Sequence, residues 1–392
     1  MGITDEHSGG LVFSNGLSRV FHCNHYNAYL QMVVLLSDGI EGCAPRALLQ
    51  RAAVPLIERQ RSAGSTTEAL VADFSQRGFG VLIPNGDGQW RTPHSHYGEA
   101  AYSYGKPEFN CYFTAGYIEG LTGYETEEVA CQRVGDPEDV FTVSAAPSHV
   151  PTPLIAPPEL STPPDAVADF STRVDAATIA RGVAELPLRG HPMPEGNGLI
   201  DAFGVTLTHH YADYYNQISY ETLRGLLNAG IPAEDAKEQF VQAGHICGFF
   251  TLGGIMRSPE WAALVQPMCD DREDWIHGIV AVVNCLGWGV WRLEALEPEQ
   301  TLVFRIYNSY EGVGYRRLYP QTDDRTVSFL ALGVAQGIAN LLWKIDIRER
   351  PELTKDYYVN VFNRTDSRTF AATQTHAIAA GDAFDRIVVQ RA

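Results

Sequence analysis

The residues most suited to chemistry lie in FHCNHYNAYL, residues 21–30, where two histidines, a cysteine and a tyrosine fall within five positions. On a helix, His22 and His25 would share one face, where they could bind a metal or transfer a proton. The predicted catalytic groups are these two histidines, Tyr26, and Cys23 as a nucleophilic thiol. The alternative interpretation is a hydrogen-bonded polar cluster at the end of a structural element.

A second group of polar residues occupies TPHSHYGEA, residues 92–100. On a strand, His94 and His96 would point the same way, and Glu99 follows them closely. Two histidines and a carboxylate are the composition of a non-haem iron or other transition-metal site. We predict Glu99 as a catalytic acid or base. The predicted ligand-binding residues in this segment are His94, His96 and Tyr97, and solvated histidines at an exposed strand end are the alternative.

The overall composition limits the class of protein. A chain of 392 residues with 45% hydrophobic and 19% charged residues has room for two packed domains. The net charge of −18 disfavours nucleic acid as a partner, because phosphate binding needs clustered lysine and arginine. No apolar run reaches the roughly 18–20 residues of a membrane span, and the N-terminal residues lack a signal-peptide pattern. We therefore predict a cytoplasmic protein without a membrane partner.

Cysteine usage and motif content restrict the chemistry further. Seven dispersed cysteines with no CxxC pair are typical of reduced thiols in a cytosolic protein. The sequence has no P-loop, no GxGxxG after a predicted strand, no GxSxG and no HExxH. We therefore expect no nucleotide cofactor, and ordinary hydrolase or zincin chemistry has no support.

A proline-rich stretch divides the chain. Seven prolines lie between residues 147 and 164, a composition that gives an extended connector. We predict a first domain over 1–146, a linker over 147–197 with a short helix in DAATIARGVAEL, and a second domain over 198–392.

The two halves repeat each other in six ordered matches. His25-Tyr26 is matched with His210-Tyr211, and HYGEA (96–100) is matched with SYEG (309–312). These matches add four residues to the predicted ligand-binding set: His210, Tyr211, Tyr310 and Glu311. Two apolar segments keep glycines four residues apart, in 111–120 and 328–337, and strand–turn–strand patterns close each half. We predict an α+β protein of two tandem mixed-sheet domains backed by helices and packed as a pseudo-dimer.

The run GKPEFNCYFTAGYIEGLTGYETEEVACQRVGDPEDVFTV, residues 105–143, resembles the 4-vinyl-reductase-type domain, also called the hydrocarbon-binding domain. The shared features are a Cys-aromatic start to a glycine-spaced helix, then Glu-x-x-Cys, then Gly-Asp and a closing strand. Such domains form the sensor half of phenol- and xylene-responsive transcription activators. The resemblance implies a mixed sheet backed by helices, an enclosed pocket for a small aromatic or apolar molecule, and often a homodimer.

The resemblance also implies a zinc site built from cysteines and a glutamate. Glu128 and Cys131 match the Glu-x-x-Cys part, but Asp139 stands where a further cysteine is expected. The remaining ligand would be Cys111 or His96. The resemblance therefore implies zinc in an altered site, and iron is the expected metal if the histidine-rich group binds one. The corresponding second-half positions are Ser328, Ala377 and Asp385, which cannot form such a site.

Three functions remain open from the sequence. The leading hypothesis is a protein that binds a small aromatic or apolar metabolite in an enclosed pocket. The alternative is a metal-dependent or acid–base enzyme of a specialised metabolic pathway, which uses the histidine-rich first half on its substrate. A scaffold subunit of a larger complex is the third.

Overall fold

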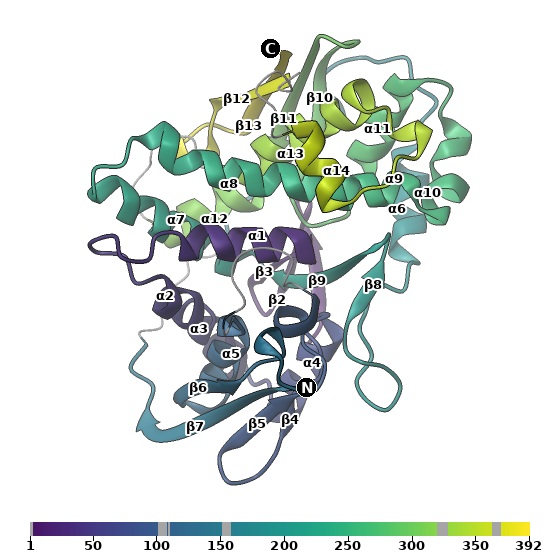
Figure 1. Ribbon diagram of the computed structural model, residues 1–392. Helices are drawn as coiled ribbons and strands as arrows, with labels where there is room; N and C mark the ends of the chain where they lie inside the picture. Colours follow the sequence, from purple (N-terminus) through teal and green to yellow (C-terminus); the bar gives the residue numbers. More distant parts are fainter. Residues whose placement is uncertain (1–2, 101–107, 109, 151–157, 320–327, 363–369) are drawn as a thin grey trace.

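The computed structural model describes residues 3–100, 108, 110–150, 158–319, 328–362 and 370–392. It contains three sheets with helices packed around them, which confirms the predicted α+β class (Figure 1). Among the described residues, all of the strand pairings are antiparallel, whereas a mixed sheet was expected. Some adjacent strands are joined by hairpins, and β3 and β9 pair across the two halves. The β5–β7 and β11–β13 pairs are connected by longer segments that contain helices and another strand, and they are antiparallel as well.

The helices were predicted only in part by the sequence. In chain order they are α1 (Asn24–Leu35), α2 (Pro45–Arg51), α3 (Val54–Ser62), α4 (Thr67–Gln76), α5 (Tyr112–Thr122), α6 (Ala176–Ala184), α7 (Ala212–Asn228), α8 (Ala233–Cys247), α9 (Gly253–Arg257), α10 (Pro259–Leu264), α11 (Arg272–Val283), α12 (Tyr310–Leu318), α13 (Phe329–Ala339) and α14 (Lys355–Phe362). Short π or 3₁₀ segments are η1 (His96–Ala100), η2 (Gln132–Val134), η3 (Gly248–Leu252), η4 (Gln266–Met268), η5 (Asn340–Lys344), η6 (Ile347–Glu349) and η7 (Ile378–Ala380). Within the described residues, none of the helices is long and apolar enough to cross a bilayer.

Each half ends in a four-stranded sheet, and the two sheets have the same strand order. The first-half order is β4 (Ile83–Pro84), β5 (Gln89–Thr92), β7 (Asp139–Pro147), β6 (Tyr124–Ala130). The second-half order is β10 (Val290–Glu297), β11 (Thr301–Tyr307), β13 (Asp385–Arg391), β12 (Phe370–His376). The repeated order agrees with an internal duplication, and Figure 1 shows the two sheets at opposite ends of the molecule.

A five-stranded sheet joins the halves. Its order is β1 (Asp5–Ser8), β2 (Leu11–Ser14), β3 (Leu17–Cys23), β9 (Val205–Tyr211), β8 (Ile200–Ala202). The central pair, β3 with β9, comes from one half each and has Phe21 opposite His209. Each repeat therefore contributes a strand to a shared sheet.

Backbone hydrogen bonds around this central pair define which residues are equivalent. Phe21 N–H donates to the carbonyl of Leu286 at 3.0 Å, and His209 N–H donates to the carbonyl of Arg77 at 2.9 Å. The two bonds are equivalent, because in each of them a residue of one half's central strand donates to a backbone carbonyl of the other half. In addition, β3 and β9 both end where a helix begins. His22 is thus the counterpart of His210. The sequence match of His25 with His210 was wrong, because short His-Tyr motifs can be matched three residues out of place.

The helices with glycines four residues apart are α5 and α13, as predicted. A side chain at Gly116 of α5 would overlap with the Gln50 carbonyl oxygen and contact Ala53. A side chain at Gly333 of α13 would overlap with α8 in the same way, near Gly244. Ala53 therefore corresponds to Gly244. The glycines allow α5 to lie against the backbone at the end of α2, and they allow α13 to lie against the backbone of α8.

The predicted linker contains the expected helix, α6. Its Ile179 is fully buried, and α6 packs against α11 of the second half. Beyond it, Gly190 N–H donates to Gln76 O at 3.1 Å, and Gly80 N–H donates to Gly198 O at 2.9 Å. The end of the linker is thus fixed to the first half by backbone hydrogen bonds.

Candidate metal centre and neighbouring pocket

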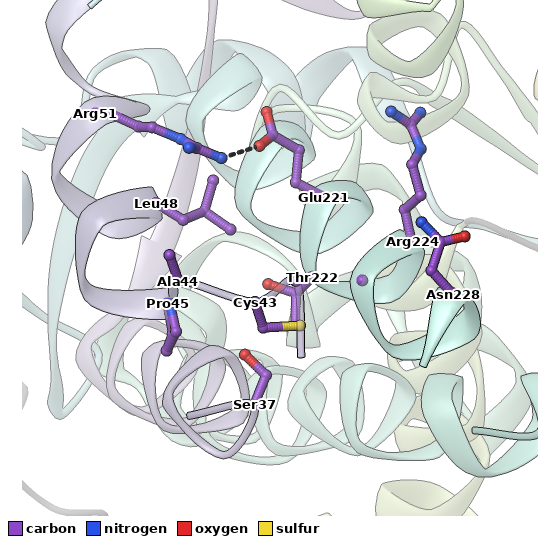
Figure 2. Close-up of a pocket in the computed structure, with 12 residues that line it drawn as sticks. Ser37, Cys43, Ala44, Pro45, Leu48, Arg51, Glu221, Thr222, Arg224 and Asn228 are labelled. Atoms are coloured by element: carbon purple, nitrogen blue, oxygen red, sulfur yellow. Dashed lines mark hydrogen bonds and ion pairs between the residues drawn. The ribbon is translucent and has the colours of Figure 1, made fainter. Parts of the chain in front are cut away.

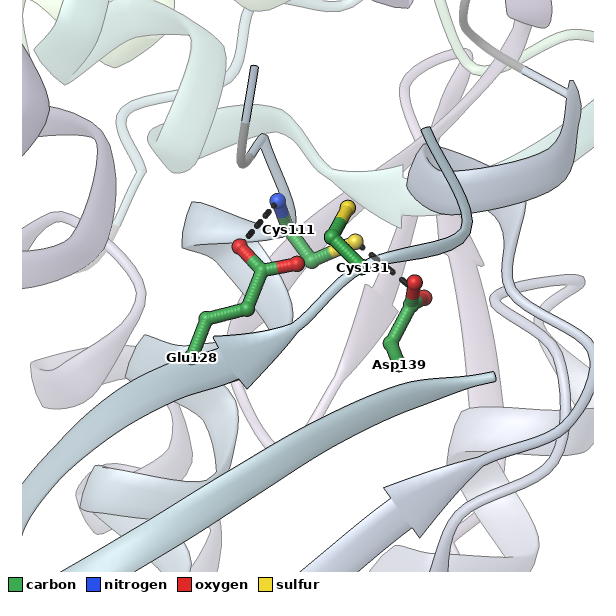
Figure 3. Close-up of side chains that lie close together, drawn as sticks. All are labelled: Cys111, Glu128, Cys131 and Asp139. Atoms are coloured by element: carbon green, nitrogen blue, oxygen red, sulfur yellow. Dashed lines mark hydrogen bonds between the residues drawn. The ribbon is translucent and has the colours of Figure 1, made fainter. Parts of the chain in front are cut away.

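Four side chains that could bind a metal converge at one edge of the first-half sheet (Figure 3). Cys111 precedes α5, Glu128 lies on β6, Cys131 follows that strand, and Asp139 begins β7. Their ligand atoms all lie within 4.8 Å of one another. Within the described part of the chain, no other group of three or more His, Cys, Asp or Glu residues meets this criterion.

The turn between β6 and β7 brings two of these residues together. Cys131 N–H donates to Asp136 at 2.8 Å, and Gln132 N–H donates to Asp139 Oδ1 at 2.8 Å. Gly135, with φ of 105°, lets the chain reverse after η2, in a conformation that favours glycine. The Glu-x-x-Cys spacing and the Gly-Asp turn are therefore local devices that fold the ligand residues onto one another.

Polar contacts within the cluster leave one acceptor unsatisfied. The Cys111 thiol donates to Asp139 Oδ2 at 3.2 Å, and Cys111 N–H donates to Glu128 Oε2 at 3.0 Å. Glu128 Oε1 is buried and has no hydrogen-bond partner among the described residues. A buried acceptor without a partner is costly, and a cation at this point would satisfy it.

The cluster holds protons at neutral pH. Burial, together with the neighbouring Cys131, raises the pKa of Glu128 to about 10. Burial also raises the pKa of Cys111 and of Asp139. A hydrogen bond from Cys111 lowers the pKa of Cys131 to about 7. Four acidic groups in one dry site cannot all ionise unless a cation neutralises them.

Two sulfur and two carboxylate ligands fit a four-coordinate divalent metal. Zinc binds Cys and Asp or Glu at about 2.0–2.3 Å and favours tetrahedral sites. Ferrous iron accepts the same ligand types. Of the two expected candidates for the first ligand, the structure brings Cys111 to the cluster and keeps His96 away.

The second half has a hydrogen-bonded network at the equivalent place. Gln374 occupies the position of Glu128, and its amide donates to Asp385 Oδ1 at 3.0 Å. Ser328, the counterpart of Cys111, donates to Asp385 Oδ2 at 2.8 Å. Ala377 replaces Cys131, so neither thiolate is present. The sequence comparison missed Gln374, although its position seven residues before Gly381 matches that of Glu128 before Gly135.

A pocket of about 380 Å³ lies beside this cluster of candidate ligands. Asn110 connects the two, because its Oδ1 lies 3.5 Å from Cys131 Sγ and its backbone carbonyl accepts from Gln31 Nε2 at 3.0 Å. Gln31 is 6% exposed, and its Oε1 has no partner among the described residues. The pocket is lined by Ala28, Gln31, Met32, Leu35, Leu36, Asp38, Arg46, Glu108, Asn110 and Arg133.

Two further pockets lie elsewhere. One of about 200 Å³ lies between α2 and α7, where the Arg51–Glu221 ion pair of 2.5 Å spans its edge (Figure 2). Another of about 700 Å³ lies between the β8–β9 turn and α10. The predicted ligand-binding histidines and tyrosines line none of these three pockets.

The predicted group of His94, His96 and Glu99 is not assembled. The chain leaves the extended conformation and enters the π-helical turn η1 at His96, so the two histidines diverge. His94 is on the surface, with Nδ1 3.3 Å from Glu99 Oε2. His96 is fully buried, and its Nε2 lies 2.9 Å from the Asn27 amide nitrogen. Burial lowers the pKa of His96 to about 3, so the ring is neutral.

The predicted catalytic residues also separate. His22 is on β3 and the helix begins only at Asn24, so His22 and His25 do not share a helix face. Instead His22 stacks on Tyr26 with ring centroids 4.2 Å apart. His25 stacks on Phe250 at 3.8 Å. Glu99 is exposed at another place, so these residues form no common catalytic centre.

The second-half residues of the predicted ligand set have structural contacts. His210 Nε2 lies 3.1 Å from Tyr97 OH, and Tyr211 lies under the Arg19 guanidinium at 3.5 Å. Glu311 accepts backbone hydrogen bonds at the start of α13, from Leu330 and Ala331 at 2.9 and 3.1 Å. Tyr310 packs edge-on against His22, with ring centroids 5.8 Å apart.

Sequence reasoning missed the polar centre of the protein. Asn27 of α1 donates to Thr208 at 3.0 Å and accepts from Tyr215 OH at 2.6 Å, besides its contact with His96. These residues are buried and come from both halves. No motif marks them, because their partners lie up to 188 residues away.

Comparisons with known proteins add little to this geometry. No protein-family model and no curated protein matches the sequence. The chain is similar to a solved structure described as the crystal structure of the phenol-responsive sensory domain of the transcription activator PoxR with phenol. The TM-score is 0.38 and the identity 15%, over 55% of this chain and 90% of that chain. The site described above therefore rests on the contacts of this chain alone.

Proposed function

We propose that this chain binds a small aromatic molecule in the pocket beside Asn110, and that a zinc ion held by the neighbouring cluster shapes that pocket. The observation that carries the proposal is the connection through Asn110, which contacts Cys131 on one side and Gln31 on the other. A bound metal would fix Cys111, the residue that follows Asn110, and Cys131, whose thiol contacts the Asn110 side chain. The role of the metal in this proposal is structural.

The pocket lining favours an aromatic ligand with a hydroxyl group. Met32, Leu35 and Leu36 supply an apolar wall, and 380 Å³ is the size of a small-molecule site. The unpaired Oε1 of Gln31 is a buried acceptor, so a ligand hydroxyl would satisfy it. Asn110 holds the Gln31 amide nitrogen, which leaves the amide oxygen for the ligand.

Phenol and anisole are matched probes for this pocket, because only phenol has a hydroxyl donor. Isothermal titration should show phenol binding about five- to tenfold more tightly than anisole, the effect of one net hydrogen bond. Gln31→Leu should remove this difference while leaving anisole binding in place. Equal affinities for the two probes in the wild-type protein, or binding unchanged by Met32→Trp, would contradict the proposal. Val359→Trp, on the exposed face of α14, is the matched control.

Metal content is the second test. Elemental analysis of the purified protein should find one zinc per chain, and Cys131→Ser should lose most of it, because zinc depends on its thiolates. Cys285→Ser is the control, since this thiol only donates to the Ala281 carbonyl at 3.4 Å. Asp139→Cys should bind zinc more tightly than the wild type. A wild-type protein that binds no zinc when it is supplied would contradict the assignment of the cluster.

Zinc affinity should depend strongly on pH. The metal-free cluster keeps a proton on Glu128, whose pKa is about 10, and zinc must displace it. Each displaced proton changes the affinity about tenfold per pH unit, in the direction of tighter binding at higher pH. Competition with a chelator at pH 6, 7 and 8 measures this slope. A pH-independent affinity would contradict the proposed ligand set.

A further inference from the structure

Two buried cysteines from opposite halves lie together at the junction of the repeats. Cys23 is the last residue of β3, and Cys247 is the last residue of α8. Both are fully buried, and their thiols are hydrogen-bonded neighbours. Thr251 lies against the same pair, with its hydroxyl 3.6 Å from Cys247 Sγ. The pair is independent of the metal cluster and the pocket described above.

The surroundings of Cys23 favour a thiolate. Its sulfur caps the first turn of α1 and accepts from Tyr26 N–H at 3.4 Å. Burial raises the pKa of this thiol, but hydrogen bonds from Cys247, Thr251 and the helix N-terminus more than offset that effect and lower the pKa. By contrast, burial raises the pKa of Cys247, which keeps its proton. The pair thus places the more acidic thiol, Cys23, beside the less acidic thiol, Cys247.

A neutral histidine is placed beside the second thiol. His22 Nδ1 lies 3.7 Å from Cys247 Sγ, and burial lowers the pKa of the ring well below its usual value. A neutral imidazole at this point can accept the proton that Cys247 loses when its sulfur reacts. The three groups come from β3 and α8 and are brought together by the packing of the two halves.

The duplicated fold supplies an internal comparison. The equivalence of Ala53 and Gly244 places Leu56 where Cys247 stands, and Tyr211 occupies the position of Cys23. Leu56 and Tyr211 are both buried. The junction formed by Leu56 and Tyr211 is therefore packed with ordinary apolar and aromatic side chains. The equivalent junction has two thiols, Cys23 and Cys247, in their place.

We propose that Cys23 and Cys247 form a reversible disulfide that joins the two halves when the protein meets hydrogen peroxide. The Cys23 thiolate attacks one peroxide oxygen, the O–O bond breaks, and hydroxide leaves and takes up a proton to become water. The Cys247 sulfur then attacks the resulting sulfenic acid, the S–S bond forms, and the S–O bond breaks to release a second water. Two thiols are oxidised and one peroxide is reduced to two waters.

Because Cys23 and Cys247 are buried, their oxidation should be selective for small oxidants. Hydrogen peroxide is small enough to reach a site that larger thiol reagents enter slowly, so the pair should resist alkylation in the native protein. The resulting bond would connect residues far apart in sequence, because it would join β3 of the first half to the end of α8 in the second half. It should therefore raise the Tm of the oxidised protein, and dithiothreitol should reverse this rise only slowly in the native state.

The test is a disulfide map of the full-length reduced protein before and after treatment with hydrogen peroxide. Free thiols are blocked with iodoacetamide after denaturation, and unreduced peptides are identified by mass spectrometry. We expect a linked Cys23–Cys247 peptide, loss of two of the seven thiols, and a higher Tm, all reversed by prolonged incubation with dithiothreitol. Cys247→Ala should lose the link and the Tm rise together, whereas Cys285→Ser should keep both.

Three results would overturn the proposal. These are two separately alkylated thiols after treatment, a sulfinic acid at Cys23 in place of the link, or Cys247 linked to a different cysteine. The wild-type map alone decides between these results and the expected one, so the proposal is testable even if Cys247→Ala does not fold.

Discussion

Asp73→Ala is expected to lower the free energy of unfolding by about 3–5 kcal/mol, because it leaves a buried positive charge without its carboxylate partner. Asp73 accepts from Arg19 at 2.7 Å and from Arg77 at 2.8 Å. The Arg19 side chain is 0% exposed, so water cannot replace the lost carboxylate. Arg77 keeps a second partner in Asp5 at 2.7 Å. The cost therefore falls mainly on Arg19, which lies on β3 at the junction of the halves.

Urea unfolding followed by circular dichroism measures this loss. Asp270→Ala is the matched control, since Asp270 pairs with Arg173 where the two side chains are 65% and 68% exposed. That pair should contribute only about 0–1 kcal/mol. Similar losses in the two variants would show that Arg19 does not depend on Asp73.

Gly333→Ala is expected to destabilise the protein by at least about 2 kcal/mol through overpacking. A methyl group there would overlap with the Val241 carbonyl oxygen and the His245 backbone nitrogen, and backbone atoms cannot move aside cheaply. The substitution should also disturb the packing of α13 on α8 throughout its length. Thermal and chemical unfolding both report the effect.

Gly337→Ala on the same helix is the matched control. Its added methyl group would lie 3.3 Å from the nearest atom, Gly248 Cα, so a small shift suffices. The helix propensity of alanine offsets part of that strain, by up to about 1 kcal/mol. We therefore expect a change within about 1 kcal/mol at Gly337. Equal effects at both glycines would contradict the close approach of the two helices at Gly333.

The family resemblance predicted the residues of the Cys-Glu-Asp cluster, and three of these residues lie in one hairpin. Glu128, Cys131 and Asp139 are within twelve residues, and the turn that gathers them is visible as Gly-Asp in the sequence. Cys111 remained one of two alternatives, because it arrives from α5 and its approach depends on how that helix packs. The resemblance thus named residues that this hairpin brings together, but it left the fourth candidate ligand open between Cys111 and His96.

The histidine predictions failed for a different reason. The alternation that would align His94 with His96 holds only while the backbone stays extended, and η1 begins at His96. The assumption that His22 and His25 share a helix failed likewise, because β3 continues through Cys23. A boundary shifted by one or two residues reverses the side to which a side chain points.

By itself, the sequence determined the α+β class, the duplication, the glycine-spaced helices and the hairpin that holds Glu128, Cys131 and Asp139. Each of these depends on short-range periodicity or turn chemistry, which the backbone obeys locally. Only the tertiary structure decided that His22 corresponds to His210, that Asn110 links the Cys-Glu-Asp cluster to a pocket, and that Cys23 meets Cys247. Such contacts join residues far apart in the chain, and they are set by how the two halves pack across β3 and β9.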